Sequence, residues 1–202
     1  MHQFVEELGA GTLDLDKFKF YLLQDYVYLK AYCRAVALLC YRAPDLETMS
    51  AMSALLHSTL TFEMETHRNY AAEFGITREE LEAAKPAPTT LAYSSYMLDV
   101  ATREDFLGNL VCLLPCAVGY AEIGKRLSSG RASADNPFHS WIETYSSDEF
   151  LKYAGEMSSL ADMLAAGCAG SRLDGLFAIF LSSTKYEWLF WEMAYRAERW
   201  PV

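Results

Sequence analysis

The stretch LLPCAVGYAEIGKRL, residues 113–127, combines a proline, a cysteine and a tyrosine in an otherwise helical pattern. Pro115 removes a backbone donor and crowds the carbonyl of Val111, so we expect the helix to bend there. Cys116 follows at once, and Tyr120 lies four residues later on the same helix face. The pair could be a nucleophilic thiol with a supporting phenol. Both could equally fill core space, because free cysteine is among the most buried residue types.

A single carboxylate interrupts the apolar segment FKFYLLQDYVYLKAYC, residues 18–33. On a helix face of leucines and tyrosines, Asp25 is costly to bury unless it is hydrogen-bonded or meets a ligand. Tyr28 lies three residues on, within reach along the same helix. Asp25 is therefore a candidate ligand-binding acid. The alternative is that it points to solvent beside Lys30 and Arg34.

A second acid lies among aromatic residues near the C-terminus, in STKYEWLFWEMAYRAERW, residues 183–200. Glu187 is flanked by Trp188 and Trp191, so it either reaches the surface through an aromatic face or is buried in it. Burial would raise the pKa of its carboxyl group, which suits a group that donates a proton near neutral pH. An aromatic stripe at helical spacing is also typical of ordinary core.

The segment FEMETHRNY contains Glu63, Glu65 and His67, similar in type to the sets that hold paired iron in helical bundles. Such a site needs a second histidine motif on a facing helix. The other histidines, His2, His57 and His139, do not supply one. Cys112 and Cys116 likewise lack two further ligands for zinc. We therefore expect no metal site and no cofactor.

The elements that must position these residues are helical nearly throughout. The expected helices span about residues 14–42, 47–74, 77–85, 90–103, 105–127, 137–145, 147–166 and 171–200. In the second, Met52, Leu55, Leu56, Leu60 and Met64 recur in phase. Thr77 to Glu80 has the capping-box spacing, and Asn136 before Pro137 predicts an N-cap. The pattern favours one all-α domain over residues 1–202, a bundle of about seven or eight helices.

Composition excludes several classes of protein. The 202 residues are 52% hydrophobic and 22% charged, which is ordinary for a globular domain. Lysine and arginine total 17 against 27 acidic residues, so a net charge of −10 leaves no broad basic surface for nucleic acid or anionic lipid. Five cysteines without a C-x-x-C pair suit a reducing compartment. We expect a cytoplasmic protein with no leader peptide, membrane span or nucleic-acid partner.

Taken together, these clusters resemble the thiaminase II (TenA) family, aminopyrimidine aminohydrolases of the haem-oxygenase-like helical fold. The likeness extends along nearly the whole chain, as several spaced motifs in the same order. They are GTLDLDKFKFYLLQDYVYL (11–29), FEMETHRNYAAEFGI (62–76), KPAPTTLAYSSYM (85–97), LLPCAVGYAEIGKRL (113–127), WIETYSSDEF (141–150) and SSTKYEWLFWEMAYR (182–196).

The resemblance implies roles in the reaction for three residues. Cys116 matches the family's nucleophile in its L-P-C context. Glu187, in Y-E-x-x-F-W, matches the carboxyl group that donates a proton. Tyr28 matches the tyrosine that makes the thiol more reactive. The catalytic interpretation of Cys116 and Glu187 is thereby favoured over the core interpretation.

The resemblance also implies a set of substrate-binding residues. Asp25 of L-Q-D matches the carboxylate that holds the aminopyrimidine. Tyr120 and Tyr145 match phenols that contact the substrate, and Tyr93 matches another tyrosine of the pocket. The implied ligand is a small aminopyrimidine, and the family usually assembles as a homotetramer.

Two departures from the family pattern bear on function. Ala117, Val118 and Gly119 follow the nucleophile where the family usually has large aromatic residues, which removes ring surface and could widen the pocket. The family also has about one more helix upstream of MHQFVEELGAGTL, so bundle closure or assembly could differ.

The implied activity is hydrolysis of 4-amino-5-aminomethyl-2-methylpyrimidine, and potentially of thiamine, to 4-amino-5-hydroxymethyl-2-methylpyrimidine in thiamine salvage. Three alternatives remain at this point. They are a non-catalytic pyrimidine-binding protein, a di-iron oxidase on the same scaffold using Glu63 and His67, and a purely structural helical subunit.

Overall fold

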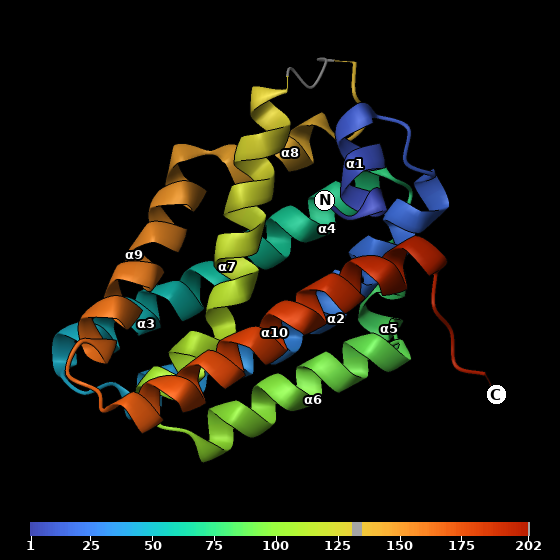
Figure 1. Cartoon of the computed structure of the whole chain (residues 1–202). Coiled ribbons are helices and arrows are strands. Elements are labelled where there is room, and N and C mark those ends of the chain that lie inside the picture. The colour runs from blue at the N-terminus through green and yellow to red at the C-terminus, as the bar shows by residue number, and fades with distance from the viewer. Residues whose placement is uncertain (131–134, 202) are drawn as a thin grey trace. The chain divides into compact units, whose positions relative to one another are not determined.

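The structure is a computed structural model that describes residues 1–130 and 135–201. Within these ranges the regular elements are helical and no strand occurs, so the expected all-α class is confirmed (Figure 1). The elements are α1 (Gln3–Ala10), α2 (Leu15–Arg42), α3 (Leu46–Ser58), the π-helical turn η1 (Thr59–Glu63), α4 (Met64–Glu73), α5 (Arg78–Ala83), α6 (Pro88–Arg103), α7 (Phe106–Ser129), α8 (His139–Ser146), α9 (Asp148–Ala165) and α10 (Gly170–Arg196).

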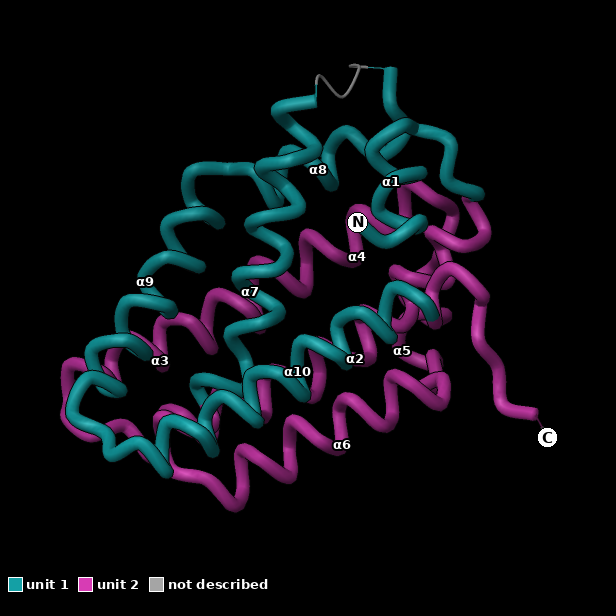
Figure 2. Tube along the Cα trace, viewed as in Figure 1, with its two compact units in different colours: residues 1–14, 110–192 teal, residues 15–109, 193–202 magenta. Residues whose placement is uncertain are grey.

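The chain divides into two compact units (Figure 2). Unit 1 comprises residues 1–14 and 110–192, and unit 2 comprises residues 15–109 and 193–202. Most of α7 and α10 therefore belongs to unit 1, whereas α2 to α6 belong to unit 2. The expectation of a single domain over residues 1–202 stays a prediction.

In unit 1, the start of α8 differs from the expectation. Asn136 does not cap α8, which begins at His139 with Phe138 as its N-cap. The side-chain amide of Asn136 instead donates to the carbonyls of Leu8 and Gly9, at 3.0 and 3.1 Å, at the end of α1. Its side-chain oxygen accepts from the Phe138 backbone N–H at 2.8 Å. The prediction of an N-cap was wrong because α8 begins at His139, two residues later than expected, although the Asn136 oxygen still accepts from the N–H two residues on.

In unit 2, α2 packs against α3, α4, α5 and α6. Buried Gln24 links α2 to the start of α6, because its amide donates to the Lys85 carbonyl at 3.1 Å and accepts from Ala87 N–H at 2.8 Å. The predicted capping box at Thr77 is confirmed at the start of α5. After α10, the Glu198 carboxylate accepts from Thr89 N–H at 2.9 Å, a favourable position for an anion at the α6 N-terminus.

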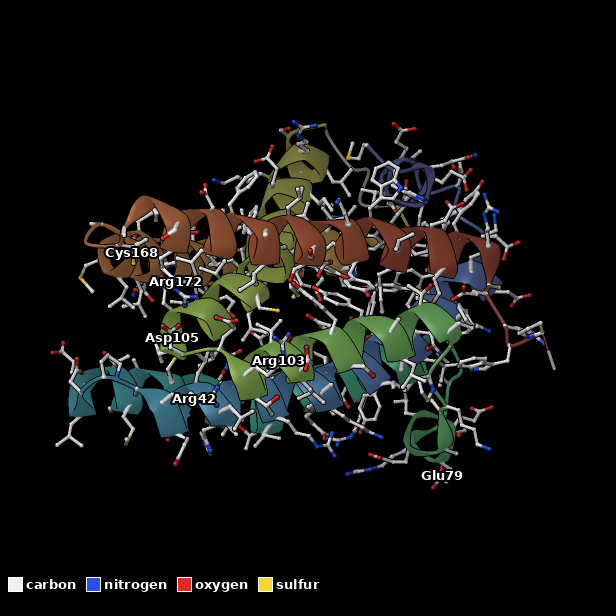
Figure 3. The ribbon with its side chains drawn as sticks, turned by 60° about the horizontal axis from the view of Figure 1, so that its bottom comes forward. Arg42, Glu79, Arg103, Asp105, Cys168 and Arg172 are labelled. Carbon is white, nitrogen blue, oxygen red and sulfur yellow. The ribbon has the colours of Figure 1, made fainter. Side chains whose placement is uncertain are left out.

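The other end of α6 is held by an arginine from the end of α2. The Arg42 guanidinium donates to the carbonyls of Ala101, Thr102 and Glu104, which the helix itself leaves without donors. Figure 3 shows Arg42 beside this end of α6, near Arg103. Both ends of α6 are thus tied to other segments of unit 2.

The long helix expected over residues 47–74 is interrupted by η1. A π-helical turn adds a residue to the helix and rotates the residues after it, so one apolar stripe cannot continue through the turn. Leu60, expected in the buried stripe, is 52% exposed, and Met52 is the buried residue of α3. After the turn, Met64 and His67 are buried. The prediction of one continuous buried stripe along residues 47–74 was therefore wrong.

Helix α7 is the one element in the described ranges that is long and apolar enough to cross a membrane by composition. In the structure, 72% of its most apolar window is buried. This burial is typical of a core helix, and α7 forms part of the core of unit 1.

Candidate active site

The candidate nucleophile, Cys116, lies on α7, and the candidate proton donor, Glu187, lies on α10, both in unit 1. The Cys112 thiol of α7 and the Ser183 hydroxyl of α10 are 3.3 Å apart. Figure 1 shows these two helices crossing. Two helical turns further along both helices, the rings of Tyr120 and Trp191 lie 5.1 Å apart between centroids. Residues four apart share a helix face. The intermediate positions, 116 and 187, therefore lie between these two contacts.

Cys116 and Glu187 are both half-buried. Partial exposure is what a reacting thiol and a carboxyl group need, because a sealed residue cannot meet a substrate. Pro115, directly before the thiol, has no N–H, so the Val111 carbonyl receives no donor from its own helix. By contrast, burial raises the pKa of the neighbouring Cys112 thiol to about 11, so that sulfur stays protonated.

Aromatic rings from two other helices, α8 and α10, surround Tyr120 of α7. Its ring lies 4.7 Å from Tyr145 and 5.8 Å from Trp141, both on α8, and 5.1 Å from Trp191 on α10. Trp141 and Tyr145 are themselves 4.5 Å apart. The two candidate phenols, Tyr120 and Tyr145, thus lie side by side in unit 1. The two tryptophans were not singled out for this role, although the four-residue spacing of Trp141 and Tyr145 could have indicated it.

Small residues follow Cys116 on α7, and one of them packs against a neighbouring helix. Ala117 packs with Ala121 and Ala154, joining α7 to α9. Val118 is 37% exposed, and a Cβ built at Gly119 would meet no atom within 4 Å. Among Ala117, Val118 and Gly119, it is therefore Ala117 that packs against another helix.

The candidate pyrimidine-binding acid lies in unit 2. Asp25 is 5% exposed, and its carboxylate accepts from the Tyr21 hydroxyl at 3.5 Å, the long limit for a hydrogen bond. Burial raises its pKa to about 7, partly offset by the Tyr21 hydrogen bond. His67 Nε2 lies 3.6 Å from the same carboxylate oxygen. Asp25 therefore does not point to solvent beside Lys30 and Arg34, which was the alternative considered from the sequence.

Two further candidate tyrosines meet beside α2. Tyr28, one turn after Asp25, and Tyr93 of α6 have ring centroids 5.0 Å apart with planes inclined by 31°. Both are buried. Such tilted ring pairs stabilise the contact between two helices and present flat aromatic surface.

The proposed iron ligands of FEMETHRNY do not gather. Glu65 is exposed and pairs with Arg68 at 3.0 Å. In residues 1–130 and 135–201, no three histidine, cysteine or acidic side chains come together in a way that could hold a metal ion. Glu63 and His67 are four residues apart, and His67 lies 3.6 Å from the Asp25 carboxylate, which was not expected from the sequence. Their i, i+4 spacing was the available signal.

The candidate residues thus fall into two sets. Cys116, Tyr120, Tyr145 and Glu187 belong to unit 1, where the contacts above bring the helices that carry them together. Asp25, Tyr28 and Tyr93 belong to unit 2.

Comparison with known proteins adds independent information. Residues 1–197 match the model of the TENA/THI-4/PQQC family. A protein of Halalkalibacterium halodurans named aminopyrimidine aminohydrolase is 45% identical over 200 residues, covering 98% of this chain and 89% of that protein. The solved structure of a TenA homologue from P. horikoshii OT3 has a TM-score of 0.88 at 34% identity, covering 96% of this chain and 90% of that one.

A more distant structure extends the fold comparison. A domain from Shewanella denitrificans described as having a heme oxygenase-like fold superposes with a TM-score of 0.75 at 19% identity, covering 96% of this chain and 84% of that one. At this identity the likeness concerns the fold alone, and it confirms the expected haem-oxygenase-like class. With the family match over nearly every residue, these findings show that the chain belongs to the TENA/THI-4/PQQC family.

Proposed function

We propose that the protein is an aminopyrimidine aminohydrolase, a thiaminase II of thiamine salvage. It hydrolyses 4-amino-5-aminomethyl-2-methylpyrimidine to 4-amino-5-hydroxymethyl-2-methylpyrimidine and ammonia. The observation that carries the proposal is that α7 and α10 are in contact on either side of positions 116 and 187, at Cys112–Ser183 and at Tyr120–Trp191. The aminopyrimidine aminohydrolase of Halalkalibacterium halodurans, 45% identical, supports the same activity.

The residue types account for the chemistry of this reaction. A carboxyl group at Glu187 protonates a ring nitrogen and makes the pyrimidine electrophilic. The thiolate of Cys116 adds to a ring carbon next to the one that bears the aminomethyl group, forming a C–S bond. The electrons then expel ammonia as the C–N bond breaks. Water adds to the resulting methylene, the C–S bond breaks, and aromaticity returns with the thiolate.

The remaining residues bind and orient the ring in this proposal. Asp25 holds the amino-substituted edge of the pyrimidine, and Tyr28 supports the thiolate by hydrogen bonding. Tyr93, Tyr120 and Tyr145 provide aromatic surface and hydroxyl groups for a flat heterocycle.

The test is incubation of the purified protein with a panel of thiamine breakdown products and thiamine itself, with mass-spectrometric identification of the released compounds. We expect ammonia and the hydroxymethyl product from the aminomethyl compound. Unchanged substrate after hours, in a folded protein, would contradict the proposal.

A second candidate is a pyrimidine-binding protein without turnover. Val118 and Gly119 favour it, because they leave open space where the family usually has aromatic surface. Calorimetric binding of the pyrimidine with no product over the same incubation would support this candidate over the hydrolase.

We further propose a cytoplasmic homotetramer. The free thiols support a reducing compartment. On α10, Leu173, Phe177 and Leu181 recur at four-residue spacing and are 42%, 65% and 39% exposed, an apolar stripe suited to burial between subunits. Analytical ultracentrifugation tests the assembly, and a monomer at micromolar concentration would contradict it.

A further inference from the structure

Helix α1 of unit 1 contacts the helix that carries one of the rings beside Tyr120. The ring of Phe4 on α1 lies 5.4 Å from that of Trp191 on α10 between centroids, with the planes inclined by 36°. Phe4 is fully buried, and Trp191 is 4% exposed. The same tryptophan packs against Tyr120. Helix α1 therefore supports the aromatic side chains that we propose for pyrimidine binding.

Buried His2 makes two hydrogen bonds with different roles. Its Nδ1 accepts from the backbone N–H of Phe4 at 3.1 Å, and His2 is the N-cap of α1. A ring nitrogen that accepts carries no proton, so the proton of this imidazole is on Nε2. Nε2 lies 2.9 Å from the Glu192 carboxylate and donates to it. One side chain therefore both caps α1 and joins it to α10.

The imidazole of His2 also meets α10 at Trp188. The two ring centroids are 4.8 Å apart, and the planes are inclined by 75°, an edge-to-face contact. Trp188 and Glu192 are four residues apart, so they lie on one face of α10. Between them on the chain is Trp191, and directly before them is the candidate proton donor Glu187. His2 therefore contacts the part of α10 that carries residues of the proposed site.

The C-terminal end of α1 is held by two further parts of unit 1. The Asn136 side-chain amide, in the segment that leads into α8, donates to the carbonyls of Leu8 and Gly9. A Cβ built at Gly9 would lie 2.5 Å from Leu127 Cδ2, so α1 approaches the end of α7 closely. Both ends of α1 are thus fixed, one on α10 and the other on α7 and the segment before α8.

The bond between His2 and Glu192 constrains this arrangement more than an exposed ion pair would. The imidazole is 6% exposed and the Glu192 side chain 33% exposed, so water screens the bond only in part. Removal of either partner leaves the other without it, and a buried donor without an acceptor is costly. Loss of the bond therefore allows α10 to shift relative to α1, and with it the ring of Trp191.

We propose that His2 and Glu192 are positioning residues for pyrimidine binding, whose hydrogen bond holds the Trp191 ring against Tyr120. This inference rests on the proposed function. In it, Tyr120 touches the substrate, whereas His2 and Glu192 act through α10 and Trp191. An aromatic surface contacts the pyrimidine in the bound substrate and in the transition state alike. Loss of the hydrogen bond should therefore raise KM and leave kcat near the wild-type value.

Two substitutions in the full chain break this hydrogen bond and keep the cap of α1. His2→Asn keeps a side-chain acceptor for the Phe4 N–H, because asparagine is a good N-cap, but its amide ends too early to reach Glu192. Glu192→Ala removes the acceptor and leaves His2 in place. Each is expected to raise KM for 4-amino-5-aminomethyl-2-methylpyrimidine about threefold to tenfold. The double variant should show no larger effect than either single one, because both remove the same bond.

Two matched controls accompany the steady-state kinetics. Glu192→Gln keeps a side-chain oxygen that accepts from His2, so its KM should return to nearly the wild-type value. Glu122→Ala removes an exposed carboxylate of α7 that pairs with Arg126 at 2.8 Å, and it should change neither constant. Calorimetric titration with 4-amino-5-hydroxymethyl-2-methylpyrimidine should show the same factor in Kd as in KM. Thermal unfolding of each variant sets an assay temperature at which all of them are folded.

The outcomes separate this inference from the proposed function. Wild-type KM in both His2→Asn and Glu192→Ala would overturn the inference while hydrolysis stands. A lower kcat at unchanged KM would also overturn it, because that result indicates displacement of Glu187 instead of the aromatic rings. Effects that add in the double variant would mean that the two side chains act independently, again overturning it. A wild-type protein that neither binds nor hydrolyses the pyrimidine would instead reject the proposed function.

Discussion

The two sets of candidate residues are held in place by different physical means. In unit 1, Cys116 and Glu187 are positioned by packing, through the contacts of α7 with α8, α9 and α10. In unit 2, Asp25 lies in a polar cluster whose members have pKa values raised or lowered by burial. We therefore expect activity and stability to be sensitive to side-chain volume around the unit 1 residues. Around the unit 2 residues we expect them to be sensitive to charge and to pH.

The largest effect is expected from removing the reacting groups of unit 1. Cys116→Ala and Glu187→Gln should each lower kcat/KM for amine release by a factor of about 10³ or more, since a nucleophile and a proton donor act directly on the bonds that change. Circular dichroism and thermal unfolding should stay close to wild type. Cys168→Ala is the control, because this half-buried thiol lies between α9 and α10 and donates to the Leu164 carbonyl. A Cys116→Ala enzyme with wild-type turnover would remove the nucleophile from the mechanism.

The volume sensitivity of unit 1 is tested at a glycine on α7. A Cβ at Gly124 would lie 2.3 Å from the backbone oxygen of Tyr145, so Gly124→Ala must push α8 away from α7. We expect a loss of about 3 kcal/mol in the free energy of unfolding, together with reduced activity through displacement of Tyr145. Urea denaturation measures the first, and steady-state kinetics the second.

The matched control for this substitution lies on the same helix. Gly119→Ala adds the same methyl group where no atom lies within 4 Å, and it should stabilise the helix by a few tenths to about 1 kcal/mol. Equal destabilisation by both substitutions would mean that the close approach of Tyr145 to Gly124 is not the cause of the loss in stability.

The charge sensitivity of unit 2 is tested at Asp25. Its folded-state pKa of about 7 lies above the unfolded value of 3.8, so ionising the buried carboxyl group costs stability as pH rises from about 4 to about 7. Asp25→Asn removes that cost. At pH 8 the variant should therefore be more stable than wild type, by on the order of 2 kcal/mol, and the difference should disappear near pH 4.

Measurement of Tm against pH checks this prediction, and the same variant should lose pyrimidine binding. Asp99→Asn is the control, because Asp99 is exposed and pairs with Arg103. A stability difference for Asp25→Asn that does not change with pH would mean that the carboxyl group is not the source of the effect.

The range of each interaction decides how much of the fold and the site could be predicted. Helix existence and the capping box at Thr77 depend on local spacing, which the sequence contains directly. The contact of Asn136 with the end of α1 was not predicted, because its partners Leu8 and Gly9 are distant in sequence. The exposure of Leu60, which depends on the π-helical turn, and the approach of His67 to Asp25, which depends on how two helices pack, were not predicted either.

The smallest expected effects compare two arginines near the end of α6, both labelled in Figure 3. Arg42 donates to three backbone carbonyls that have no helical donors, so Arg42→Ala should cost about 1–2 kcal/mol of unfolding free energy. Arg103 forms an exposed ion pair with Asp99 one turn away, and Arg103→Ala should cost less than about 0.5 kcal/mol. Raising salt to about 1 M should shrink the Arg103 effect and leave most of the Arg42 effect, because screening acts on exposed charges and less on backbone hydrogen bonds. Equal costs for the two substitutions would mean that α6, which carries Tyr93, does not depend on Arg42 for its position.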